Sequence, residues 1–98
     1  MVNRDVVLKD LRDELDALDD RILALFAERY RIRDRVMALK IAHDMPIIAQ
    51  DRVEAILSRL EARAAALNIP PEFARALYSL VLDYSHKYEE EFRNRKAG

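Results

Sequence analysis

Residues 8–39 read LKDLRDELDALDDRILALFAERYRIRDRVMAL, and this stretch decides the fold. Alternating spacings of three and four residues define one seam along it: Leu8, Leu11, Leu15, Leu18, Ile22, Leu25, Arg29, Ile32, Val36 and Leu39. Apolar side chains at this spacing predict a long helix that packs its seam against other helices. Arg29 is the one charged residue in the seam, and its guanidinium cannot lose its proton. Burying it therefore requires an anionic partner, which is either Glu89 in a buried salt bridge or a ligand.

Composition favours a small all-helical protein. The chain has 98 residues with one Gly and three Pro, which suits one domain that is helical nearly throughout. Lys and Arg number 17 against 18 Asp and Glu, for a formal net charge of -1. This balance excludes the basic footprint of a nucleic-acid-binding protein and a polybasic membrane anchor. The absence of cysteine excludes a disulfide framework, a zinc–thiolate site and a thiol nucleophile.

Targeting and metal-binding signals are missing from the sequence. Residues 1–5 contain no apolar signal core, and no apolar run approaches the roughly 20 residues that span a bilayer. His43 and His86 have no partners at the spacing of metal ligands. We therefore expect a cytoplasmic protein with no metal, no nucleic-acid partner and no membrane partner.

The length of the first helix predicts a second chain. The helix is expected to begin near Asp5 or Asp10 and to end near Ala42. Some 36 residues would extend roughly 54 Å, whereas a compact chain of this size has a radius of gyration of about 13 Å. Most of the seam would then be buried by another copy, so the predicted architecture is an intertwined homodimer.

Two breakers separate two further helices. Residues 43–46 form the first breaker, in which Pro46 disfavours helix, and residues 47–49 form a short apolar linker. Residues 68–72, with Pro70 and Pro71, form the second breaker. The second helix is expected at 50–66, and the third from about Pro71 to Arg95, with residues 93–98 frayed. The predicted organisation is a single domain, residues 1–98, made of three helices.

Polar residues recur on the apolar faces of these helices. Lys40 follows Arg29 by 11 positions, which returns it to within about 20° of the same face, some 16 Å further along the helix. Both side chains could therefore reach one interior pocket. Ser85 and Glu89 are four residues apart on the third helix and share a face. Arg52 opens the second helix, where a surface position is the simpler interpretation.

Arg12 adds an argument for two chains. It precedes Arg29 by 17 residues, about 25 Å along the helix axis and about 100° around it. One chain cannot easily bring both arginines to a small ligand. Two chains with antiparallel first helices could do so.

These residues resemble a known family over essentially the full chain. LRDELDALD at 11–19, LFAER at 25–29, Lys40 and residues 46–52 are similar to the all-helical, or AroQ-class, chorismate mutases. The resemblance implies three-helix chains that interlock as homodimers with two active sites. Each site would take one arginine from the first helix of the other chain. The implied activity is the Claisen rearrangement of chorismate to prephenate, which uses no cofactor.

The resemblance also implies roles for single residues. Arg12 would be the arginine contributed across the dimer, and Arg29 would bind a substrate carboxylate. Lys40 would bond a carboxylate and the ether oxygen of the breaking bond. Arg52 would support the site from the second helix, and the Ser85 hydroxyl would lie near the ring carboxylate.

Three positions depart from the family pattern. Glu89 stands where bacterial members often have a Gln that donates a hydrogen bond to the ether oxygen, and Glu89 must be protonated to donate one. Val53 and Ala49 stand where members often have Glu and Asp, which accept from the ring hydroxyl of chorismate. Isochorismate pyruvate lyase, on the same fold and forming salicylate, and a mutase for 4-amino-4-deoxychorismate therefore remain alternatives. So does a non-catalytic helical dimerisation module.

No dehydrogenase, dehydratase or synthase segment is visible in the sequence, and neither is a fourth segment that would bind an allosteric amino acid. We therefore expect any partner enzyme to be a separate chain.

Overall fold

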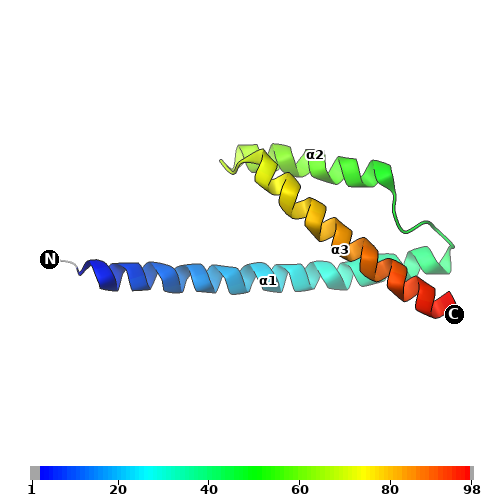
Figure 1. Cartoon of the computed structure of the whole chain (residues 1–98), viewed down its shortest axis with the longest axis horizontal. Helices are drawn as coiled ribbons and strands as arrows, with labels where there is room; N and C mark the ends of the chain where they lie inside the picture. The colour runs from blue at the N-terminus through cyan, green and yellow to red at the C-terminus, as the bar shows by residue number, and fades with distance from the viewer. Residues whose placement is uncertain (1–2, 98) are drawn as a thin grey trace. The chain divides into compact units, whose positions relative to one another are not determined.

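The computed structural model describes the backbone of residues 3–97 and the side chains of residues 3–95. It contains three helices, α1 (Arg4–Ala42), α2 (Gln50–Ala66) and α3 (Pro71–Ala97), and no strand within the described residues (Figure 1). The predicted all-α class with a very long first helix is therefore confirmed. Within the described residues, no helix is long and apolar enough to cross a membrane.

The helix boundaries follow local chemistry. The Asn3 side chain caps α1, because its Oδ1 accepts hydrogen bonds from the backbone N–H groups of Asp5 (2.8 Å) and Val6 (3.4 Å). α1 ends at Ala42, and α2 occupies 50–66, as the sequence predicts.

The end of α3 differs from the sequence prediction. The helix continues to Ala97, so the expectation that the chain frays from residue 93 is wrong for residues 93–97; Gly98 lies outside the described residues. Nothing in this stretch forces an end, because it contains no proline and no glycine before position 98.

The chain divides into two compact parts, Met1–Asp34 and Arg35–Gly98, and α1 contributes to both. In the first part the apolar seam is exposed in the single chain, with Leu11 at 51%, Leu15 at 58% and Leu25 at 63%. α1 thus presents a continuous apolar face that one copy of the chain leaves uncovered.

A defined turn ends α1 directly after Lys40. The N–H of Met45 donates to the carbonyl of Lys40 (2.7 Å), and the N–H of Asp44 donates to the carbonyl of Ile41 (3.2 Å). Asp44 has a φ of 51°, in the left-handed region. These bonds form a Schellman motif, which satisfies the last carbonyls of the helix and reverses the chain.

α2 and α3 form a hairpin in the second part (Figure 1). Its core consists of Ile56, Leu57 and Leu82, with Val53, Leu60 and Tyr78 packed against them.

An ionic cluster also joins α2 and α3. The guanidinium of Arg75 on α3 donates to the carboxylates of Glu61 and Glu54 on α2, with the Glu54 bonds at 2.9 and 3.2 Å. These bonds, first those with Glu61 and then those with Glu54, raise the pKa of Arg75 above its ordinary value. Because the side chain of Arg75 is 42% exposed, water screens the cluster, and the buried apolar residues contribute most to the pairing of the two helices.

Candidate functional site

A polar row lies in the buried part of α3. Ser85 and Glu89 are each only 3% exposed, and they lie one helical turn apart on one face, as their spacing predicts. Ser85 Oγ and Glu89 Oε2 make no hydrogen bond with any described residue. Buried polar atoms in folded proteins almost always have a partner, so atoms that lack one inside the chain call for a partner from outside it, such as water, an ion or a bound ligand.

The last turn of α1 brings Lys40 to this row. Its Nζ lies 3.9 Å from Glu89 Oε2, within ion-pair range but too far for a hydrogen bond. The same Nζ donates to the carbonyl of Ile47 at 2.6 Å. An ammonium has three N–H donors, and only one of them is used by Ile47. The others remain available for Glu89 or for an anionic ligand beside it.

The turn at residues 43–47 holds Lys40 at two points. The backbone carbonyl of Lys40 accepts from Met45, and its side-chain ammonium donates to Ile47. The side chain is 19% exposed, so most of its stem is packed. Lys40 is therefore a positioned cation, which is the property required to stabilise charge at a fixed place.

Three of the predicted site residues do not belong to this buried cluster. Arg52 is exposed on the first turn of α2, so the structure does not bury it with Lys40 and Glu89. Arg12 is exposed and Arg29 is half-buried, and both belong to the first part of the chain. The two alternatives for Arg29, a salt bridge with Glu89 or a bound ligand, both stay predictions.

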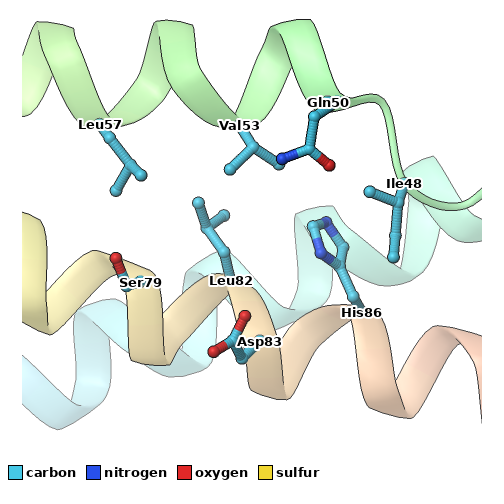
Figure 2. A pocket seen from close by; sticks show the side chains of 8 residues that line it. All are labelled: Ile48, Gln50, Val53, Leu57, Ser79, Leu82, Asp83 and His86. Atoms are coloured by element: carbon cyan, nitrogen blue, oxygen red, sulfur yellow. The ribbon is translucent and has the colours of Figure 1, made fainter.

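A small hollow lies elsewhere on the hairpin, between α2 and α3. Figure 2 shows Val53 and Leu57 from α2 facing Leu82 from α3, while the ring of His86 points toward Gln50. Its volume of about 160 Å³ is below that of a typical ligand pocket. None of the predicted substrate-binding residues lines it. Val53 is thus part of the apolar packing of the hairpin.

Sequence reasoning missed Arg93. Its Nη2 is buried and, among the described residues, has no hydrogen-bond partner, like the free atoms of Ser85 and Glu89. Arg93 follows Glu89 by four positions, and this spacing was the available signal. Because the end of the third helix was expected to be frayed, Arg93 was not considered as a buried residue.

Comparison with known proteins gives a consistent result. The family model of chorismate mutase type II matches residues 11–90. The T-protein of Haemophilus influenzae is 43% identical over 63 residues, which is 62% of this chain and 17% of that protein. A bifunctional chorismate mutase/prephenate dehydratase of Enterobacter agglomerans is 33% identical over 84 residues, 86% of this chain and 22% of that protein. The 4-amino-4-deoxychorismate mutase of Streptomyces venezuelae is 28% identical over 90 residues, 92% of this chain and 87% of that protein.

The chain spans about a fifth of the length of the first two relatives, and most of the length of the third. The family match extends from α1 through α2 into α3 and includes Arg12, Arg29, Lys40, Ser85 and Glu89. The resemblance seen in the sequence is therefore confirmed, and the chain belongs to the chorismate mutase type II family.

Proposed function

We propose that this protein is a chorismate mutase, which converts chorismate to prephenate. The observation that carries the proposal is the positioned ammonium of Lys40 beside the buried, unsatisfied Ser85–Glu89 row, in a chain of this family. In this Claisen rearrangement one C–O bond breaks as one C–C bond forms within the same molecule. The reaction needs no nucleophile, so the protein has to hold the substrate in its reactive shape and stabilise charge on the ether oxygen.

Cationic residues supply the first requirement. The substrate is a dianion, and Arg29 together with Arg12 would pair with its carboxylates, each able to form a bidentate contact. The Ser85 hydroxyl, buried and unpartnered, would donate to the ring carboxylate. Arg52, exposed on α2, would support the site from the solvent side.

Lys40 and Glu89 supply the second requirement. Negative charge grows on the ether oxygen as the C–O bond breaks, and a donor already fixed in place stabilises it without reorganisation. Lys40 is held by the carbonyl of Ile47 and lies 3.9 Å from Glu89, whose side chain is only 4% exposed. Protonated Glu89 would be the second donor to the same oxygen.

A second copy of the chain would complete the site. The seam of α1 is exposed along a helix of 39 residues, and an apolar face of this extent is typical of an interface. A two-fold dimer places the same face of each chain against the other, so the antiparallel α1 helices would cover one another's seams. This arrangement would carry Arg12 of one chain toward Arg29 and Lys40 of its partner.

Mixing two inactive variants tests the shared site. Arg12→Ala and Lys40→Ala are each expected to be inactive as homodimers. After unfolding and refolding together in equal amounts, half of the dimers combine one chain of each kind. Each mixed dimer has one site with both residues intact, so activity should return to about a quarter of the wild-type value.

The control mixes the single variant Arg12→Ala with the double variant Arg29→Ala/Lys40→Ala. It should give the same recovery of activity, because Arg29 and Lys40 are proposed to act in one site contributed by the same chain. No recovery in either mixture, while sedimentation shows dimers, would contradict an Arg12 that crosses between chains. A monomer at micromolar concentration would contradict the dimer itself.

The residues at positions 49 and 53 support a second candidate substrate in place of chorismate. Val53 and Ala49 carry no carboxylate to accept from a ring hydroxyl, and Val53 faces the hairpin core (Figure 2). A relative matched over 87% of its length is named a 4-amino-4-deoxychorismate mutase. The 4-amino compound is therefore the second candidate, followed by isochorismate.

Direct assay separates these substrates. Purified protein is incubated with chorismate, 4-amino-4-deoxychorismate and isochorismate, and the products are separated by chromatography. We expect chorismate to give prephenate at the highest kcat/KM. A higher kcat/KM for the amino compound, or salicylate and pyruvate from isochorismate, would replace the proposed substrate. No turnover and no binding of any of these dianions would identify a non-catalytic dimerisation module.

A further inference from the structure

We propose that Arg93 is an additional substrate-binding residue of this site and takes one carboxylate of the dianion; this inference rests on the proposed function. The starting observation is a row of three polar side chains on α3. Ser85 Oγ, Glu89 Oε2 and Arg93 Nη2 are the buried side-chain atoms without a hydrogen bond among the described residues. Each of these residues follows the one before it by four positions, so the three lie on consecutive turns of α3. Each is rotated by about 40° around the helix axis from the one before it.

One nitrogen of Arg93, Nη2, is buried without a hydrogen-bond partner in the described chain, while the residue as a whole is half-buried. A guanidinium stays protonated in proteins, and a buried N–H of a charged group without a partner costs more than that of a neutral group. Glu89 is one turn away, yet its ion pair is with Lys40, and Arg93 forms no ion pair within the described residues. The partner of Arg93 is therefore expected to be a ligand.

The expected direction of the Arg93 side chain would place this ligand beside Ser85 and Glu89. Long side chains on a helix lean toward its N-terminus and cover the preceding turn. This lean would bring the guanidinium of Arg93 toward the turn that carries Glu89, which is the residue that Lys40 approaches from α1. Lys40 and Arg93 would then both lie near the carboxyl group of Glu89.

Arg93 would add one positive charge to the proposed site. With Glu89 protonated, as its proposed role requires, Arg93 joins Arg12, Arg29 and Lys40 as a cation facing the two negative charges of the substrate. Arg93 can bind a carboxylate through two parallel N–H···O bonds, whereas Lys40 acts as a point charge suited to a single oxygen. We therefore assign to Arg93 an additional contact with one carboxylate, beside those proposed for Arg12 and Arg29, and leave Lys40 directed at the ether oxygen.

The test compares Arg93→Met with Arg95→Met in the full-length protein. Arg95 is an exposed arginine two residues further along the same helix. Loss of a charge-assisted contact should raise the KM for chorismate about 10- to 100-fold in Arg93→Met, with a smaller change in kcat. Arg95→Met should stay within about twofold of the wild type, as expected for an exposed charge. Arg93→Lys should recover part of the loss, because it keeps the charge but not the two-pronged geometry.

A ligand series gives a readout that a purely structural role would not change. We compare inhibition by a bicyclic dicarboxylate that mimics the rearranging ring with inhibition by its monomethyl ester. The wild type should prefer the dicarboxylate, and Arg93→Met should lose most of this preference. If Arg93→Met does not fold, Arg93→Lys becomes the deciding variant and must still show a several-fold higher KM.

Two failures are distinguishable. An active wild type with an unchanged KM and an unchanged dicarboxylate preference in Arg93→Met would overturn the role of Arg93 alone. Equal effects of Arg93→Met and Arg95→Met would overturn it as well. A wild type that neither converts chorismate nor binds the dicarboxylate would overturn the proposed function, and the inference with it.

Discussion

Replacing Lys40 by alanine is expected to lower kcat for chorismate about 100- to 1,000-fold, the usual cost of losing one fixed donor to a developing oxyanion. The ammonium is held by the carbonyl of Ile47 at 2.6 Å and lies 3.9 Å from Glu89 Oε2. Alanine removes both the donor and the cation that offsets the buried carboxyl group. Single-turnover kinetics would separate the loss in the chemical step from slower substrate binding.

Two controls decide whether the effect is specific. Lys87→Ala removes an exposed lysine from α3 and should leave kcat within about twofold of the wild type. Lys40→Arg keeps a cation but alters the donor geometry, so it should recover only part of the activity. A Lys40→Ala protein that is folded, by circular dichroism, and retains more than a third of wild-type kcat would remove Lys40 from the mechanism.

The fold could be predicted largely from local signals. The spacing of leucines from Leu8 to Leu39 predicted a helix through this stretch, and Pro46 and Pro70 marked the two breaks. The length of α1 also indicated that one copy could not cover its seam, and the exposure of Leu15 agrees with that argument. The sequence placed the end of α3 near Arg95 but predicted fraying from residue 93, because polar residues near a chain end give no signal about whether they are helical.

The site could be predicted only in part. The four-residue spacing correctly placed Ser85 and Glu89 on one face, since helix geometry alone decides it. The bond from Lys40 to Ile47 depends on Asp44 adopting a left-handed conformation, which is uncommon for a residue other than glycine and is not signalled by the sequence. The burial of Arg93 Nη2 could not be predicted from its four-residue spacing to Glu89 alone. The roles of Arg12 and Arg29 depend on a second chain and stay predictions.

Glu89→Gln is expected to remove the pH dependence of turnover on the alkaline side. In the wild type, a protonated Glu89 donates to the ether oxygen, whereas the carboxylate formed as pH rises cannot donate. Because protonation is needed for activity, kcat should be constant at low pH and then fall about tenfold per pH unit above the ionisation of this group. The amide of Gln donates at every pH, so the variant should keep its activity and exceed the wild type at high pH.

The profile of kcat is the informative one, because it reports ionisation in the substrate complex, whereas kcat/KM reports the free enzyme. Glu90→Gln, an exposed neighbour, should leave both profiles as in the wild type. Identical profiles for Glu89→Gln and the wild type would show that Glu89 does not donate in the transition state.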